Sequence, residues 1–257
     1  MEPDTQSAEK NGTTEAPVVV QGLHKSFGTQ KVLHGVDLIA DQGETVAVLG
    51  RSGTGKSVLL KLLIGLEQPD SGTIRIRGQE ITALERKQLN QVRVKIGFLF
   101  QQGALYDSLT VGENVEFPLR RHTRLSEADR REKALELLSQ VGMKQDAAKM
   151  PSEISGGMQK RVGLARSLAL DPEILLLDEP TAGLDPITAS EIGKLILSLQ
   201  EKRKTTCIVV THDIHGAKAF CDRMVFLQEG RVSLDGTFEQ LKKSRDSFVI
   251  EFLRDAA

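Results

Sequence analysis

One glycine-rich segment constrains the fold of this chain more than any other. The apolar, β-branched residues 44–49 before it predict a buried strand, and the leucine-rich residues 58–64 after it predict a helix. A glycine loop between a buried strand and a helix is typical of an α/β fold. The loop fits the pattern G-x-x-x-x-G-K-S with Gly50, Arg51, Ser52, Gly53, Thr54, Gly55, Lys56 and Ser57.

The composition of this loop predicts that it binds phosphate groups. Glycines let the backbone turn so that successive N–H groups point inward, and the helix N-terminus adds partial positive charge there. Lys56 supplies a full charge to β- and γ-phosphates, and the Ser57 hydroxyl can ligate Mg²⁺. A chance match in a glycine-rich loop is the alternative, but the flanking strand and helix favour nucleotide binding.

Length and composition limit the remaining possibilities. With 257 residues, 39% hydrophobic and 27% charged, the chain can bury a core as one large domain or two small lobes. The balance of 34 basic against 35 acidic residues gives no argument for nucleic acid as a partner. No apolar run is long enough to span a bilayer and no signal peptide is recognisable, so we expect a chain that neither spans a membrane nor is secreted by itself, which leaves docking on a membrane protein open. A cytosolic compartment fits. Cys207 lies in an apolar segment and is expected to be an inert buried thiol rather than a ligand.

Apolar segments that alternate with helical ones predict the architecture of residues 17–240. We expect a mostly parallel sheet covered on both faces by helices. Short segments near residues 18–20, 32–39 and 73–77 predict an antiparallel β subdomain beside it, with a turn at residues 25–28.

Three further segments flank or interrupt this core. The polar residues 1–16 predict a disordered tail. Residues 103–168 predict a helical subdomain, in which Ser126 caps a helix. Residues 241–257 predict a C-terminal helical extension. Its apolar residues pack either on the core or on a partner: Phe248, Ile250 and Phe252.

Two carboxylates follow a buried strand in the second half of the chain. The apolar run that ends on Asp178 would hold this side chain rigidly in the shell of a Mg²⁺ ion opposite the phosphate loop. Glu179, directly after it, can position and polarise an attacking water as a general base. Such a pair alone would only form a turn, but its predicted place in the same sheet as the loop favours a role in hydrolysis.

A second candidate anion site precedes another predicted helix. Its residues are Ser155, Gly156, Gly157 and Met158. A serine and two glycines at a helix N-terminus can bind an anion, although in isolation they would be a helix cap. Two anion sites in one chain are explained if two chains pair and each completes the site of the other.

The order of these motifs resembles that of the ATP-binding subunits of ABC transporters over about residues 17–240. The resemblance implies a P-loop NTPase core of the RecA type, with a helical subdomain that carries the signature motif. It also implies ATP and Mg²⁺ as cofactors, and a homodimer that hydrolyses ATP to energise a separate membrane permease. The matching order is the glycine loop, Gln101, Ser155-Gly156-Gly157, Asp178-Glu179, Asp185 and His212.

The resemblance assigns roles to residues that carry little signal alone. Phe27 resembles the aromatic that stacks on adenine, although alone it would be a core residue. Gln101 resembles the glutamine that touches Mg²⁺ and the attacking water, and alone it would be a polar strand end. His212 resembles the switch histidine on the γ-phosphate, and alone it would be a helix cap. Asp185 resembles the aspartate at the dimer seam, and residues 155–158 resemble the signature motif, which binds the γ-phosphate of ATP held by the opposite subunit.

The signature segment departs from the commonest family form at two positions. Ile154 stands in place of leucine and Met158 in place of glutamine. Because the serine and both glycines are retained, the anion contacts are expected to persist, whereas affinity across the seam could differ.

Residues 55–61, 100–111 and 113–119 show a narrower resemblance to the Mla/Mce branch, which supplies ATPases to lipid transporters of the bacterial envelope. This implies a phospholipid cargo and a peripheral place on the cytoplasmic side of the inner membrane. The implied partners are an Mla-type integral permease, an MCE-domain substrate-binding protein and a small accessory subunit. Leu105, Tyr106 and Phe117 are expected to be exposed and to suit a groove for a short permease helix.

Other functions fit parts of the pattern. A permease for another substrate would use the same ATPase chemistry. A non-transport ABC ATPase of DNA repair or translation usually carries coiled coils, zinc inserts or a second such domain, none of which is visible here. A regulatory module that holds ATP without turnover often lacks one of Glu179 and His212, both present in this chain.

Overall fold

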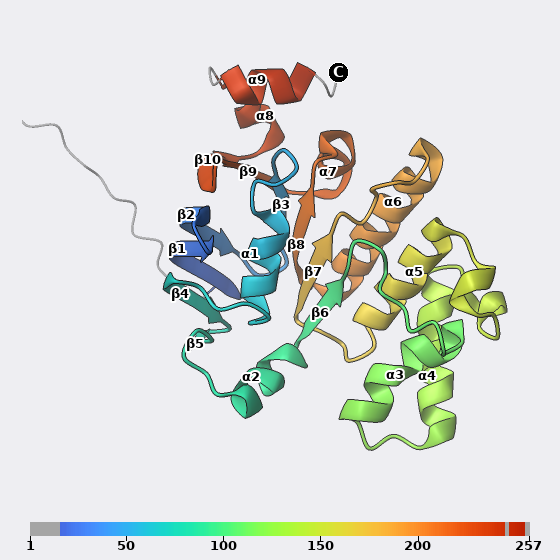
Figure 1. Cartoon of the computed structure of the whole chain (residues 1–257). Helices are drawn as coiled ribbons and strands as arrows, with labels where there is room; N and C mark the ends of the chain where they lie inside the picture. The colour runs from blue at the N-terminus through green and yellow to red at the C-terminus, as the bar shows by residue number, and fades with distance from the viewer. Residues whose placement is uncertain (1–15, 245–246, 255–257) are drawn as a thin grey trace, which may run out of the picture.

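The computed structural model describes residues 16–244 and 247–254 (Figure 1). The predicted tail, residues 1–16, lies outside the described part except for Ala16. None of the helices in the described part is both long and apolar enough to cross a membrane.

A six-stranded sheet forms the centre of the molecule, with strand order β10-β9-β3-β8-β7-β6. The five strands from β9 to β6 pair in parallel and β10 is antiparallel to β9, which confirms the predicted mostly parallel sheet. Every residue of β3, β7 and β8 is buried, as continuous apolar runs in a covered sheet require. The strands are β3 (Thr45–Leu49), β6 (Ile96–Leu99), β7 (Ile174–Asp178), β8 (Thr206–Thr211), β9 (Arg223–Gln228) and β10 (Arg231–Gly236).

Helices cover both faces of this sheet (Figure 1). Because successive strand residues point to opposite faces, Leu176 of β7 joins the apolar cluster that contains Leu60 of α1, whereas Leu175 and Leu177 join the cluster that contains Leu164 of α5. The covering helices are α1 (Lys56–Leu63), α2 (Arg86–Arg93), α5 (Gly156–Ser167), α6 (Pro186–Arg203) and α7 (Ile214–Phe220).

A second, four-stranded sheet packs beside α1 with strand order β2-β1-β4-β5 and antiparallel pairing. This is the predicted antiparallel β subdomain. The predicted turn at residues 25–28 is wrong in part, because Phe27 still pairs with Gln30 and the hairpin turns at Gly28, whose φ is 60°. The strands are β1 (Val18–Phe27), β2 (Gln30–Ala40), β4 (Ser71–Ile76) and β5 (Gln79–Glu80).

The segment between β6 and β7 is helical. It contains α3 (Val111–His122), α4 (Glu127–Gln140), α5 and the short 3-10 turns η1 (Lys144–Asp146) and η2 (Pro151–Glu153). The hydroxyl of Ser126 accepts a hydrogen bond from the Asp129 N–H at 3.2 Å, which confirms the predicted cap of α4. Val115, Leu138 and Leu164 bring the three long helices into one apolar cluster.

Two short helices end the described chain: α8 (Phe238–Leu241) and α9 (Ser247–Arg254). Val249 is buried, and the Phe252 ring meets Phe226 edge-on with ring centroids 5.3 Å apart. The sequence left open whether Phe248, Ile250 and Phe252 pack on the core or on a partner. Phe252 packs on the core and Ile250 is half-buried. The Phe248 side chain lies outside what the structure describes.

Leu138 of α4 is expected to be a main anchor of the helical segment. Replacing it with alanine should lower the free energy of unfolding by about 2–5 kcal/mol, because its fully buried side chain leaves a cavity. Leu135→Ala is the matched control, since this half-exposed leucine lies on the same helix and should cost much less. Denaturant unfolding measures both, and equal losses would contradict the packing described for α4.

Candidate nucleotide site

The glycine loop occupies the turn between β3 and α1, as predicted. Gly55 precedes the helix with a φ of 101°, in the left-handed region that favours glycine. At Gly50 a Cβ atom would lie 2.4 Å from the carbonyl oxygen of Leu227, so only glycine fits. The loop backbone is therefore held close to the sheet edge, with the N-terminus of α1 directly behind it.

Lys56 folds back over the loop that precedes it. Its Nζ donates hydrogen bonds to the carbonyl oxygens of Gly50 at 2.8 Å and Arg51 at 3.0 Å. Burial lowers the pKa of Lys56, while the carboxylates of Glu179 and Asp178 act in the opposite direction. The ammonium group thus lies inside the loop, where it can face an anion.

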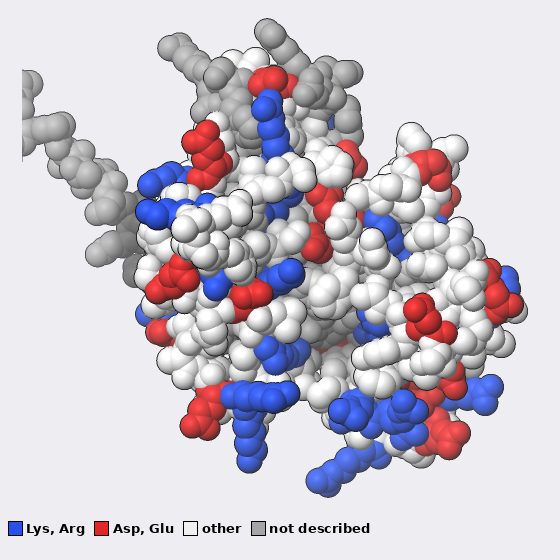
Figure 2. All heavy atoms as spheres, in the orientation of Figure 1, with Lys and Arg blue, Asp and Glu red and all other residues white. Residues whose placement is uncertain are grey.

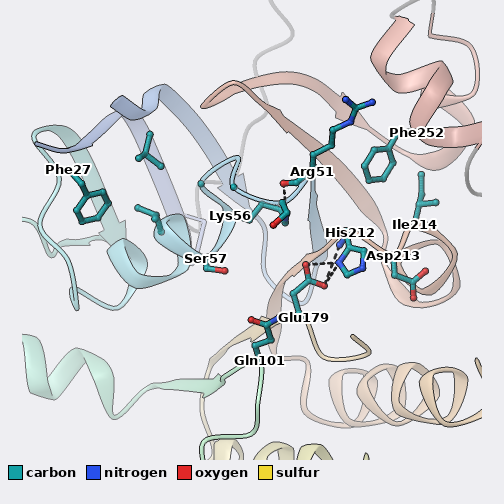
Figure 3. Close-up of a pocket in the computed structure, with 15 residues that line it drawn as sticks. Phe27, Arg51, Lys56, Ser57, Gln101, Glu179, His212, Asp213, Ile214 and Phe252 are labelled. Carbon is teal, nitrogen blue, oxygen red and sulfur yellow. Dashed lines mark hydrogen bonds and ion pairs between the residues drawn. The ribbon is translucent and has the colours of Figure 1, made fainter. Parts of the chain in front are cut away.

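Ser57 and Asp178 come together from α1 and β7. The Ser57 hydroxyl donates a 3.0 Å hydrogen bond to Oδ1 of Asp178, and burial raises the pKa of this carboxyl group. A hydroxyl beside a carboxylate is a donor set that suits Mg²⁺. Gln101 and Ser57 line one cavity (Figure 3). Ser57, Asp178 and Gln101 are therefore the candidate residues to hold the ion.

Glu179 is the first residue after β7, and its φ of 49° is unusual for a residue other than glycine. Its carboxylate accepts hydrogen bonds from the Thr211 hydroxyl at 3.2 Å and from the His212 N–H at 3.4 Å. The His212 Nδ1 lies 2.9 Å from both carboxylate oxygens (Figure 3). The sequence predicted both residues but not their contact, which arises because β7 and β8 are neighbours whose carboxyl ends meet.

A cavity of about 750 Å³ joins most of these residues. Phe27 lies at one end of it (Figure 3); the residue is 44% exposed, and the Nζ of Lys25 lies 4.9 Å from its ring centroid. An exposed ring at the cavity edge suits stacking against a flat ligand. The predicted residues that line the cavity are Phe27, Arg51, Ser52, Gly53, Gly55, Lys56, Ser57, Gln101, Glu179 and His212.

The other predicted loop residues act on the loop itself. The Gly50 carbonyl receives Lys56, and the Thr54 hydroxyl donates to the carbonyl oxygen of Arg51 at 2.9 Å. Gln101 follows β6 by two residues rather than ending it, because the strand stops at Leu99.

The C-terminal helix α9 supplies a part of the site that the sequence did not predict. Phe252 lines the cavity, and Glu251 forms an ion pair with Arg51 of the loop at 2.9 Å. The amphipathic pattern of the C-terminal segment signals packing, but no local feature of the sequence identifies the loop as its neighbour.

The signature segment lies away from this cavity. The Ser155 hydroxyl accepts a hydrogen bond from the Met158 N–H at 3.3 Å, so within the chain it caps α5. Asp185 likewise caps α6 through the N–H groups of Ile187 and Thr188, and hydrogen bonding from Thr188 lowers its pKa. None of the predicted residues of the signature segment and the dimer seam lines the cavity of its own chain: Ser155, Gly156, Gly157, Met158 and Asp185.

Both cysteines are free thiols within the described part of the chain. Burial raises the pKa of Cys207 to about 12, which suits the expected inert thiol.

A glycine loop with an inward lysine, opposite a buried strand that ends on Asp178 and is followed by Glu179, defines a P-loop nucleotide-binding protein. The chain belongs to the ABC transporter family, whose family model matches residues 33–182.

Relatives with a named transport role are similar over most of this chain. The probable ribonucleotide transport ATP-binding protein mkl of Mycobacterium tuberculosis is 43% identical over 92% of the chain, which spans 66% of mkl. The intermembrane phospholipid transport system ATP-binding protein MlaF of Haemophilus influenzae is 40% identical over 92% of the chain and 90% of its own length. The methionine import ATP-binding protein MetN of Brucella abortus is 37% identical over 90% of the chain and 63% of its own length.

Solved structures of ATP-binding cassettes share the fold. A dimeric post-hydrolysis state of the cassette MJ0796, bound to ADP and Pi, superposes with a TM-score of 0.80 at 37% identity. The match covers 86% of this chain and 98% of that one. The predicted P-loop NTPase fold is therefore confirmed.

Lys56 is expected to carry much of the affinity for ATP. Lys56→Ala should raise the Kd for ATP by about 10–100-fold, because a buried charge-assisted contact to phosphate is lost. Lys61→Ala is the matched control, since this exposed lysine lies on the same helix and should bind ATP normally. Calorimetric titration measures both, and an unchanged affinity for Lys56→Ala would assign binding to the backbone alone.

Proposed function

We propose that this chain binds ATP with Mg²⁺ at a homodimer interface and hydrolyses it to drive a separate membrane permease. The observation that carries this proposal is the Glu179 carboxylate, held by Thr211 and His212 beside the Ser57–Asp178 pair. A buried carboxylate fixed in one orientation next to a candidate metal site suits a general base.

Different residues of this chain accept the proton and stabilise the charge during hydrolysis. Glu179 accepts the proton of the attacking water, and its contacts with Thr211 and His212 keep its oxygens aimed into the cavity. Lys56 and the loop N–H groups stabilise charge on the phosphate oxygens. A bound Mg²⁺ would supply further positive charge there, held by Ser57, Asp178 and Gln101.

A second chain would complete each site. Ser155, Gly156 and Gly157 do not line their own cavity, and a Cβ at Gly156 would meet no atom within 4 Å, so this surface is open. The helix N-terminus there provides N–H groups for an anion. The similar cassette MJ0796 is a dimer with ADP and Pi, which supports the same pairing here.

Mixed dimers test the composite site and the ATPase activity together. Lys56→Ala and Ser155→Arg chains should each be inactive alone. Mixed, they should recover part of the ATPase rate, because one site then combines two intact halves. The control mixes Lys56→Ala with a chain that carries both changes, which should stay inactive. Full activity of either single variant alone would contradict the composite site.

A groove beside the Gln101 segment suits the permease contact. Tyr106 is 46% exposed, and its ring centroid lies 4.6 Å from that of Phe117. The guanidinium of Arg166 donates to the carbonyl oxygens of Ala104 and Gly103, both at 2.8 Å. It thus fixes the segment between Gln101, which lines the nucleotide cavity, and Tyr106, which lines the groove. Leu105 and Phe117, both expected to be exposed, are instead half-buried. Leu105 packs against the helical segment. The groove is lined by Val94, Phe98, Phe100, Tyr106, Phe117, Pro118 and Leu170, among others.

Basic side chains gather on the same edge of the molecule. Figure 2 shows Lys and Arg along the lower edge, where Figure 1 places α2, α3 and α4. Exposed basic residues of α2, α3 and the connection from α3 to α4 are Arg86, Lys87, Arg120, Arg121 and Arg124. Positive charge on the edge that carries the groove suits the anionic cytoplasmic surface of a membrane, and supports a peripheral place on the inner membrane.

The cargo that we propose is a lipid, and specifically a phospholipid. The similarity to MlaF, which extends over 90% of that protein, supports an Mla-type permease, with an MCE-domain protein and a small accessory subunit as further partners. The alternative, that this ATPase serves a permease for another substrate, rests on the similarity to MetN, which is lower and extends over 63% of that protein.

Tyr106 is the position at which to test the permease contact. Tyr106→Glu should keep the fold and ATP affinity, since the ring is half-exposed, yet lose permease binding and lipid movement, because a carboxylate is costly in an apolar groove. Tyr106→Phe is the matched control and should copurify with the permease. Copurification from membranes identifies the partner. A sugar, amino-acid or metal permease, or none, would refute the lipid assignment and leave the ATPase assignment standing.

A further inference from the structure

Lys160 is a buried lysine that none of the roles above uses. It lies on α5 and is only 6% exposed. Its Nζ donates hydrogen bonds to the carbonyl oxygens of Glu179 at 2.9 Å and Ala182 at 2.6 Å. Burial lowers the pKa of Lys160, and the nearby Glu179 and Asp178 carboxylates oppose this shift. Burying an ammonium group destabilises the fold unless hydrogen bonds compensate the lost hydration. The two carbonyl acceptors supply this compensation for Lys160.

The two carbonyl groups belong to the turn that sets the direction of Glu179. The left-handed backbone at Glu179 is strained for a residue other than glycine and must be held by its surroundings. On one side the Glu179 N–H donates to the Val210 carbonyl oxygen at 2.8 Å. On the other side the Glu179 carbonyl oxygen accepts from Lys160 and from the Ala182 N–H at 3.2 Å. Lys160 is thus the side chain that fixes the carbonyl end of this residue.

Lys160 also connects two parts of the chain that are distant in sequence. It is on the same helix as Ser155, Gly156 and Gly157, which lie at the N-terminal end of α5. The turn that it holds continues into Asp185, the cap of α6. A movement of α5 therefore acts directly on the backbone of Glu179.

We propose that Lys160 is a positioning residue for ATP hydrolysis, which ties the Glu179 carboxylate to the signature helix of the same chain. This inference rests on the proposed function. In the proposed dimer, α5 of one chain contacts the nucleotide held by the loop of its partner, whereas Glu179 serves the nucleotide in its own loop. Through Lys160, nucleotide bound in the partner's loop therefore affects the position of the Glu179 carboxylate, which acts on the nucleotide of its own chain.

The test compares Lys160→Met with Lys160→Arg and with Lys194→Met, which changes an exposed lysine on α6. Lys160→Met should lower kcat by about 10–100-fold, as expected for a misplaced catalytic group, with the KM for ATP within about threefold of the wild type. Its Hill coefficient for ATP should fall towards 1. Lys160→Arg, which keeps the donors, should restore part of kcat, and Lys194→Met should match the wild type.

A double-variant cycle separates positioning from a merely structural role. If Lys160 acts through Glu179, adding Lys160→Met to Glu179→Gln should reduce the residual rate no further. Additive losses, or a kcat for Lys160→Met equal to that of the wild type, would overturn the inference. Should Lys160→Met fail to fold, the same cycle with Lys160→Gln decides the question. A wild-type chain without ATPase activity would instead refute the proposed function, and this inference with it.

Discussion

Four buried charged side chains at the carboxyl edge of the large sheet depend on one another: Lys56, Lys160, Asp178 and Glu179. Each would be costly to bury alone, and each is compensated. The lysines donate to main-chain carbonyl groups, and the carboxylates accept from hydroxyl groups. The packing of α1, α5 and β7 brings these four charges together. The charges are therefore compensated only while these three elements are packed against one another.

The sequence predicts the parts of this arrangement that depend on local pattern. The glycine loop, the apolar run before Asp178 and the cap at Ser126 are each set within a few residues, and all lie where expected. The missed features depend on long-range packing. Strand pairing extends β1 through Phe27, and the contacts of Lys160 join residues 19 and 22 positions apart. A lysine in a helix gives no local sign that it is buried.

The separation of the predicted site residues into two groups is informative in itself. The loop, Gln101, Glu179 and His212 share one cavity, whereas the signature segment and Asp185 cap helices elsewhere. Local reasoning finds both groups, because glycine loops and caps are short motifs. It cannot place one relative to the other, since that arrangement depends on the sheet order and on assembly.

The tyrosine ring in the groove gives the molecule an optical property. The sequence contains one tyrosine and no tryptophan, so Tyr106 is its sole strong intrinsic fluorophore. This ring is partly exposed beside Phe117, and it lies in the segment that begins at Gln101 in the cavity. Tyrosine emission from the unlabelled chain therefore reports on the groove, and a change in that emission marks an event at this surface without any added dye.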